Sequence, residues 1–186
     1  MRKRWKVPLL ALATVMVAGG IYLAGLQETG NFHEVIPGEL YRSAQPTAEE
    51  IRDYAARYGI RTVLNLRGAD NSAWYKAETE AAAAAKIEHI DFRLSPTKRV
   101  TPDTMRRLVA LMKAAPKPIL IHCRSGSDRT GLASVLYLHE VAGVDEVTAE
   151  KQLSIYYGHF SIPFLSQAYA MDESWEDLEQ LLGMKS

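Results

Sequence analysis

The sequence predicts an α/β domain with a central, mainly parallel sheet flanked by helices, preceded by an N-terminal apolar helix. Short apolar runs alternate along the chain with longer stretches of helical propensity, which indicates strands separated by helices. Residues 118–122 read Pro-Ile-Leu-Ile-His, an almost wholly apolar run that is typical of a strand buried in the middle of a parallel sheet. No internal repeat is visible, so we expect one domain over residues 39–186, long enough to bury a core.

Four strands and six helices are expected in this domain. The strands are expected at residues 39–43, 61–66, 88–94 and 118–122, and the helices at 47–58, 74–87, 101–115, 130–141, 145–157 and 172–182. The first helix has the clearest ends. Thr47 and Glu50 form a capping box at its start, and Gly59 closes it.

The elements that follow are supported by other local patterns. Five consecutive alanines at 81–85 favour a helix, and residues 88–94 alternate apolar and polar side chains as a half-buried strand does. A Thr-Pro pair at 101–102 opens the next helix, because proline is well tolerated at the first helical position. Several polar and aromatic residues follow strand ends and are candidates to line a site: Arg67, Asp70, Trp74 and Tyr75.

The N-terminal segment, residues 1–26, reads as a membrane anchor or a signal peptide. Its first six residues include four basic ones, and residues 7–26 are uncharged and mostly apolar. A helix of this length spans a hydrocarbon core of ~30 Å, and the basic cluster predicts a cytoplasmic N-terminus with the domain across the membrane. The alternative is cleavage at a weak small-residue site, 18–20, although the apolar stretch continues beyond it. Residues 27–38 are expected to form a linker.

The charge and cysteine content exclude some functions. The net charge is zero, but without the N-terminal cluster 18 basic residues face 22 acidic ones, so the domain lacks the basic excess typical of nucleic-acid binding. Cys123 is the only cysteine, so no internal disulfide can form. The histidines show no metal-ligand spacing, and we expect no metal and no cofactor.

A chemically distinctive turn follows the apolar strand. It begins at Cys123 and reaches Arg129 after five intervening residues, where a helix starts. The backbone N–H groups of such a turn, with the helix N-terminus behind them, form an anion site, and Gly126 permits the tight geometry. A tetrahedral dianion fits there, and Arg129 can bind two of its oxygens. The same field stabilises a thiolate, so Cys123 can attack phosphorus and form a phosphocysteine that water hydrolyses.

Residues 122–131 resemble the His-Cys-x5-Arg-[Ser/Thr]-Gly signature of the protein tyrosine and dual-specificity phosphatases. Residues 40–46 and 65–67 look like the opening of bacterial and atypical dual-specificity members, so the resemblance covers roughly residues 32–131. It implies a protein tyrosine phosphatase-like fold and the following catalytic roles: Cys123 as nucleophile, Arg129 as phosphate ligand, Thr130 as hydrogen-bond donor to the thiolate, and His122 as the residue that orients the loop. The substrate-binding residues are expected to be Arg124, Ser125, Gly126 and Ser127.

The proton donor departs from the family pattern. The resemblance implies an aspartate on the loop before the nucleophile's strand, but residues 95–100 contain no acid. Asp128 directly precedes Arg129, as in a bacterial variant of the family, and is the candidate general acid. Asp91 is one alternative, and a water molecule or no general acid at all is the other. An acid at position 128 also stabilises a helix N-terminus without any catalytic role.

The expected substrate is a protein carrying phosphotyrosine, with phosphoserine or phosphothreonine also open. A phosphoinositide or another small phosphorylated alcohol is the alternative. A rhodanese-like sulfurtransferase is less favoured, because its loop usually has four residues between cysteine and arginine. The basic cluster and the apolar run predict a domain on the outer face of the membrane, which in a bacterium is the periplasmic face of the inner membrane, as a single-pass protein or, after cleavage, as an exported soluble one.

Overall fold

The computed structural model of the 186-residue chain describes residues 6–183. Most of the predicted basic cluster falls in residues 1–5, outside the described part. The sheet has five strands in the order β1-β2-β5-β3-β4. The strands are β1 (His33–Ile36), β2 (Leu40–Ser43), β3 (Thr62–Asn65), β4 (Glu88–Asp91) and β5 (Ile119–His122). Only β1 runs antiparallel to its neighbour, so the prediction of a mainly parallel sheet is confirmed.

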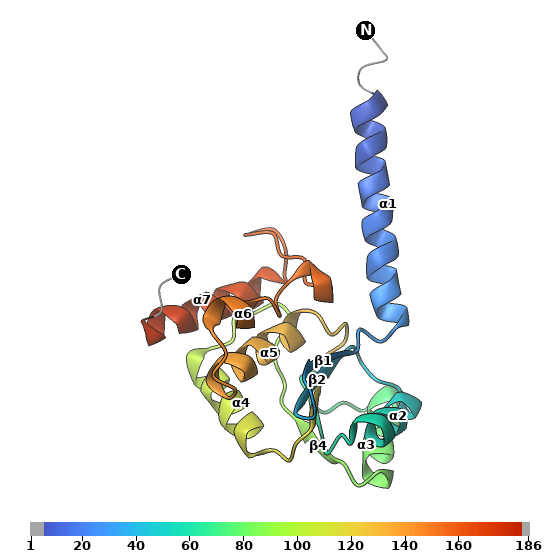
Figure 1. The fold of residues 1–186 in the computed structure, drawn as a ribbon, viewed down its shortest axis with the longest axis vertical. Helices are drawn as coiled ribbons and strands as arrows, with labels where there is room; N and C mark the ends of the chain where they lie inside the picture. The colour runs from blue at the N-terminus through green and yellow to red at the C-terminus, as the bar shows by residue number, and fades with distance from the viewer. Residues whose placement is uncertain (1–5, 184–186) are drawn as a thin grey trace.

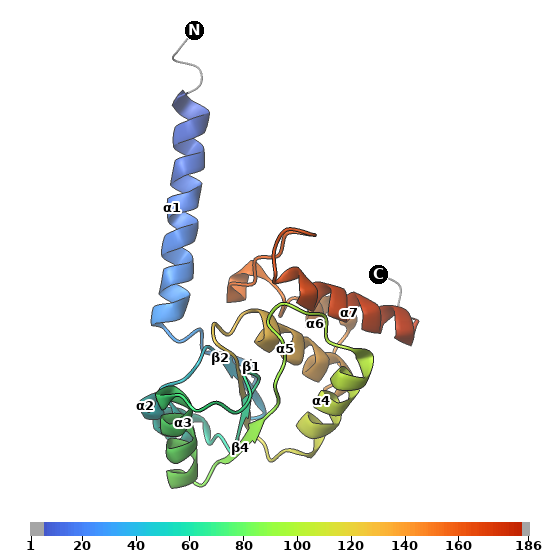
Figure 2. The ribbon, with the colours of Figure 1, turned by 180° about the vertical axis from the view of Figure 1, so that it is seen from behind.

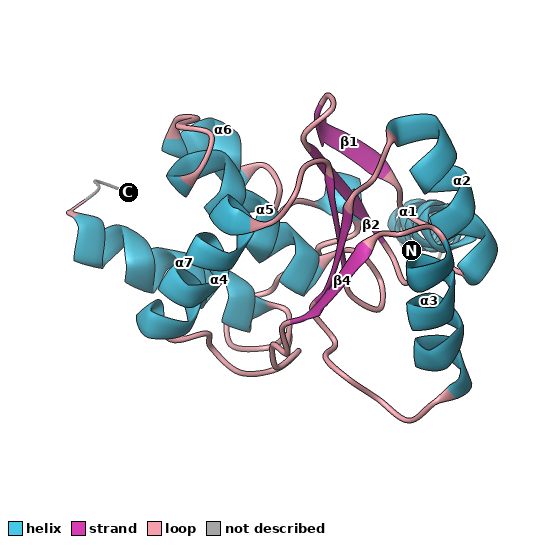
Figure 3. Ribbon diagram, turned by 90° about the horizontal axis from the view of Figure 1, so that it is seen from below, coloured by secondary structure: helices cyan, strands magenta, loops and turns pink. Residues whose placement is uncertain are grey.

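Helices cover both faces of the sheet (Figure 3). One face carries α2 (Ala48–Tyr58) and α3 (Ala73–Ala84), and the other carries α4 (Pro102–Ala114), α5 (Asp128–Glu140), α6 (Glu146–Glu150) and α7 (Tyr169–Leu182). A short 3-10 helix, η1 (Ile155–Tyr157), follows α6. The remaining helix, α1 (Lys6–Glu28), projects away from the domain (Figures 1 and 2).

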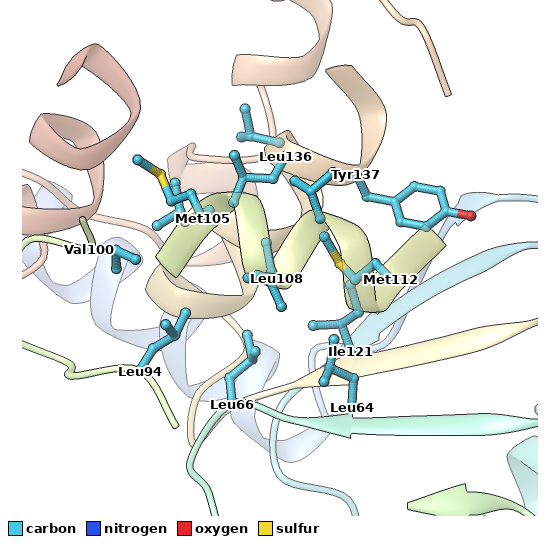
Figure 4. Close-up of a cluster of buried hydrophobic side chains, with 14 of the residues drawn as sticks. Leu64, Leu66, Leu94, Val100, Met105, Leu108, Met112, Ile121, Leu136 and Tyr137 are labelled. Atoms are coloured by element: carbon cyan, nitrogen blue, oxygen red, sulfur yellow. The ribbon is translucent and has the colours of Figure 1, made fainter. Parts of the chain in front are cut away.

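Two apolar cores hold these layers together. The larger core joins β5 and β3 to α4, α5 and α7, and Figure 4 shows side chains such as Leu64, Leu108 and Ile121 packed within it. The smaller core joins the opposite face of the sheet to α2 and α3. Because β5 is buried on both faces, its four residues are all inaccessible, as the apolar run at 118–122 predicts.

The helix-end signals are confirmed in atomic detail. Thr47 Oγ1 accepts a hydrogen bond from Glu50 N, and Glu50 Oε2 accepts one from Thr47 N at 2.7 Å, which completes the capping box. Gly59 ends α2 in the left-handed conformation, with φ of 65°. Thr101 caps α4 through Thr104 N, so the Thr-Pro start is also confirmed.

Two expected elements differ from the structure. Residues 33–36, within the expected linker, form the edge strand β1, because a strand of four residues with a bulge against β2 shows too little alternation to be predicted from the sequence. The expected helix at 145–157 is interrupted: α6 ends at Glu150, and the Gln152 carbonyl accepts a hydrogen bond from Arg42 instead of continuing a helix.

The N-terminal helix is long and apolar enough to cross a membrane. At 1.5 Å per residue, its 23 residues extend about 35 Å, more than a hydrocarbon core of ~30 Å. The window Ala11–Glu28 has a mean hydropathy of 1.3, and its side chains are almost entirely exposed. A signal sequence can have the same length and apolar composition, so residues 1–26 fit both a membrane anchor and a signal peptide.

Candidate active site

The Cys123 loop lies at the carboxyl end of the sheet, where three parallel strands finish together. His122, the last residue of β5, pairs in register with Ser43 of β2 and Asn65 of β3. The next five residues turn, and α5 begins at Asp128. Cys123 is 2% exposed. Ligand sites of open α/β sheets form at this edge, so the fold places the cysteine where such a site is expected.

Gly126 allows the loop to approach β2 closely. Its φ of +74° lies in the left-handed region, and a Cβ there would stand 2.6 Å from Ala44 N and 2.7 Å from Ser43 O. Both the backbone conformation and the space therefore require glycine. This confirms the geometric reason given for Gly126 from the sequence.

Arg42 supports the loop from inside the domain. Its guanidinium is fully buried and donates hydrogen bonds to Gly126 O at 2.7 Å and to Gln152 O at 2.9 Å, with Tyr157 stacked 3.9 Å from it. Burial lowers the pKa of Arg42 to about 10, so the side chain stays charged at neutral pH. The carbonyl groups of Gly126 and Ser127 thus point toward a buried cation.

The segment after α1 also holds the loop. Asn31, fully buried, donates from Nδ2 to Ser125 O at 3.0 Å and to Tyr157 O at 2.9 Å. Gln27, near the end of α1, donates to the same Ser125 oxygen at 3.3 Å. The backbone of the Cys123 loop is therefore tied directly to the N-terminal segment.

His122 belongs to a buried network centred on Glu78 of α3. Glu78 Oε1 lies 3.1 Å from His122 Nε2 and 2.7 Å from His89 Nε2, and Gln45 donates to the other oxygen. Burial alone would raise the pKa of Glu78, but the hydrogen bonds from His122 and His89 lower it to about 2. Glu78 is thus a buried carboxylate that fixes the imidazole next to the cysteine.

A cavity of about 690 Å³ opens beside the loop. Its lining residues are Arg67, Asp70, Arg93, Leu94, Ser95, Pro96, Arg124 and Arg129. Burial and the positive charges of Arg129 and Arg124 lower the pKa of Arg67. Four arginines around one opening, in a domain of net negative charge, make this a site for anions.

The guanidinium groups are held by the surrounding backbone and rings. Arg129 Nη1 lies 3.4 Å from both Leu66 O and Leu94 O, and Arg67 stacks 3.7 Å from the ring of Trp74. Among the residues expected to line the mouth, Arg67 and Asp70 do so, whereas Tyr75 binds Asp91.

The candidate proton donors occupy different surroundings. Asp128 Oδ1 lies 2.7 Å from His159 Nδ1, and its side chain is about one-third exposed. Asp91 accepts hydrogen bonds from Asn65 and Tyr75 on its two oxygens. Asp70 is the carboxylate in the cavity lining, but hydrogen bonds from Ser72 lower its pKa and favour the charged form. Asp70 and His159 were not identified as acid–base candidates from the sequence.

The hydroxyl group of Thr130 is buried without a hydrogen-bond partner among the described residues. Thr130 lies in the first turn of α5. A buried hydroxyl without a partner is unfavourable, so an acceptor such as a thiolate or a leaving phosphate oxygen would satisfy it. Residues 6–183 contain no cluster of histidine, cysteine or acidic residues suited to a metal ion.

A mainly parallel sheet whose central strand is followed directly by a cysteine, with an arginine six residues later at the start of a helix, is the arrangement of the cysteine-dependent phosphatases. A model of the tyrosine phosphatase family matches residues 23–152. The chain therefore belongs to that family, and the resemblance drawn from residues 122–131 is confirmed. The match includes residues 27–38, the range expected to be a linker.

Named relatives and solved structures agree with this assignment. The chain is 26% identical to the dual specificity protein phosphatase TpbA of Pseudomonas aeruginosa over 148 residues, 78% of this chain but 63% of the relative's length. It is 31% identical to the triple specificity protein phosphatase PtpB of Mycobacterium tuberculosis over 86 residues, 46% of this chain and 30% of PtpB. The crystal structure of P. aeruginosa TpbA has a TM-score of 0.61, at 24% identity, covering 84% of this chain and 92% of TpbA. The crystal structure of PTPMT1 has a TM-score of 0.60, at 17% identity, and the match covers 82% of this chain and 98% of PTPMT1.

Proposed function

We propose that this chain hydrolyses phosphate monoesters through a phosphocysteine at Cys123. The observation that carries the proposal is that Cys123, directly after β5, opens the turn whose Arg124 and Arg129 help to line an anion-attracting cavity. The thiolate attacks phosphorus, the bond to the leaving oxygen breaks, and water later attacks the phosphocysteine and restores the thiolate. Charge on the phosphoryl oxygens is stabilised by Arg129 and by the N–H groups of residues 124–127.

The remaining residues of the loop support this chemistry. His122, fixed by Glu78, orients the loop, and Thr130 donates its unpaired hydroxyl to the thiolate as it leaves. Asp128 protonates the leaving oxygen of the substrate. Support for this role comes from its position beside Arg129 and from its contact with His159, an imidazolium that can pass a proton to Asp128 for transfer to the leaving oxygen.

The proposed substrate class is phosphotyrosine in proteins, with phosphoserine and phosphothreonine as further substrates. Similar chains include one described as a dual specificity phosphatase, and the structure of TpbA in complex with phosphotyrosine is among the similar folds. A second candidate is a small molecule or lipid headgroup with more than one phosphate. Arg67 and Arg93 favour it, because they line the cavity in addition to the two loop arginines. The structure of PTPMT1 in complex with PI(5)P shares the fold.

A substrate panel separates these candidates. The full chain would be assayed with phosphotyrosyl, phosphoseryl and phosphothreonyl peptides, with phosphoinositides, and with thiosulfate plus cyanide for sulfurtransfer. Phosphate release from the tyrosyl peptide supports the first proposal, and release from the phosphoinositides alone supports the second. Transfer of sulfur without phosphate release would contradict both.

We further propose that α1 anchors the chain as a single pass in the inner membrane, with the domain in the periplasm. The support is the length and apolar composition of α1 and the basic residues that precede it. A reporter that is active only after export, fused behind Ser186, should be active. Activity of a cytoplasmic reporter at the same position would reverse the topology, and recovery of a shortened soluble chain would indicate signal cleavage.

A further inference from the structure

An unusual apolar segment follows α6. Residues 152–171 contain no aspartate, glutamate, lysine or arginine over twenty positions, although 24% of the chain is charged. Within it lies an exposed stretch, residues 155–166, which we call the apolar loop. Of the nine large hydrophobic side chains that are exposed outside α1 in the described residues, six lie in this loop: Ile155, Tyr156, Phe160, Ile162, Phe164 and Leu165.

The tip of the apolar loop is the most exposed part. Phe164 is 90% exposed and Leu165 is 82% exposed. Phe164 also has a φ of +62°, a conformation that a residue with a Cβ rarely adopts. An aromatic side chain held outward in a disfavoured backbone conformation is a reason to look for a binding role.

The base of the apolar loop is fixed to the domain. His159, 4% exposed, lies between Asp128 Oδ1 at 2.7 Å and Asp172 Oδ2 at 3.0 Å. Asn31 binds Tyr157 O, which anchors the start of the loop. The apolar side chains are therefore presented from a tethered support.

The apolar loop begins in contact with the end of α1. Tyr22 donates a hydrogen bond to Tyr156 O at 2.6 Å. A Cβ at Gly158 would stand 3.2 Å from Leu26 Cδ1 and 3.6 Å from Leu23 Cδ2, so α1 packs closely on the backbone there. Figures 1 and 2 show the loop after η1 rising from the domain on the side from which α1 extends.

We propose that the apolar loop inserts into the interface of the same bilayer that α1 crosses. This inference rests on the membrane anchor proposed above. A bilayer is the occupant that fits, because the loop contacts an apolar helix and presents aromatic rings suited to the interface, and its one basic side chain, His159, is buried at its base between two carboxylates. Such docking would hold the domain at the membrane through two elements and fix the direction in which its catalytic cavity faces.

Site-specific quenching tests the insertion. In a Cys123→Ser background, which removes the only native cysteine, single cysteines would replace Val15 in α1, Phe164 or Leu165 in the apolar loop, and exposed Ala83 in α3. Each full-length variant would carry an environment-sensitive fluorophore and be reconstituted in dioleoylphosphatidylcholine vesicles, with or without bromine on the acyl chains.

We expect bromine to quench the probe at position 15 strongly and at 164 and 165 about half as much, because interfacial segments lie ~5–10 Å into the headgroup and acyl boundary. Position 83 should be unaffected. Quenching at 15 but not at 164 or 165 would overturn the insertion while leaving the anchor intact. Absence of quenching at every position would overturn both. A blue-shifted probe at 164 without bromine quenching would overturn the insertion and indicate that protein covers the loop.

Discussion

His159 Nδ1 lies 2.7 Å from Asp128 Oδ1, which joins the apolar loop to the residue that precedes Arg129. The other ring nitrogen of His159 binds Asp172. Burial alone would lower the pKa of His159, but the hydrogen bonds to Asp128 and Asp172 raise it to about 9. The imidazole is therefore charged at neutral pH and is held between two carboxylates.

The raised pKa of His159 predicts a pH dependence of stability. Because the folded pKa lies above the ordinary value of 6.5, the stabilisation is fully present below pH 6.5 and is lost as the pH rises through about 9. The free energy of unfolding should fall by on the order of 3 kcal/mol across that window. Urea unfolding at a series of pH values measures it. His159→Gln should remove the dependence, and an unchanged slope in that variant would refute the assignment.

Asp128→Asn should reduce turnover of a phosphotyrosyl peptide by ~10²–10⁴-fold, because a general acid matters most when the leaving group is poor. An activated aryl phosphate, whose phenolate leaves unaided, should lose far less. Steady-state kinetics on both substrates give the comparison. Asp91→Asn and Asp70→Asn are the controls. A substrate-selective loss in either variant would assign the general-acid role to that residue instead of Asp128.

Glu78→Gln should disturb the orientation of His122. Burial alone would raise the pKa of Glu78, but the hydrogen bonds from His122 and His89 lower it to about 2, so its stabilisation is present above pH 4.5 and is lost as pH falls through about 2. We expect a loss in kcat of roughly tenfold, about 1.4 kcal/mol in the barrier, and a lower free energy of unfolding at neutral pH. Glu80→Gln, exposed on the same helix, is the matched control and should change neither quantity.

Gly126→Ala should cost both stability and activity, because its Cβ would collide with the backbone of Ala44. Gly143 has a similar φ of +70° with nothing within 4 Å, so Gly143→Ala isolates the conformational cost, about 1–2 kcal/mol. Denaturant unfolding should show a larger loss for Gly126→Ala. Equal losses in the two variants would mean that the loop relaxes and the close approach is unimportant.

The sequence predicts the parts of this protein that depend on neighbouring residues. The capping box of Thr47 and Glu50, the buried run of β5 and the turn from Cys123 to Arg129 are local patterns, and each is found as expected. Gly126 could be assigned its role for the same reason.

The supporting residues depend on contacts far apart in the chain. Arg42 reaches Gly126 over 84 positions and Asn31 reaches Ser125 over 94, so no local pattern pairs them. The burial of Glu78 could have been predicted from the sequence, because Ala81 and Ala82 follow it at helical spacing. All three residues are buried on the apolar face of α3. His159 has its carboxylate partners Asp128 and Asp172 at 31 and 13 positions along the chain, so no local pattern pairs them.

The covalent intermediate tests the central claim most directly. The full chain would be mixed with an excess of an aryl phosphate, quenched rapidly in acid and examined by mass spectrometry of the peptide that contains Cys123. We expect one phosphoryl group on Cys123 in the wild-type chain, and neither the adduct nor turnover in Cys123→Ser. Phosphate release by Cys123→Ser at a rate near that of the wild type, or a phosphoryl group on another residue, would contradict the mechanism.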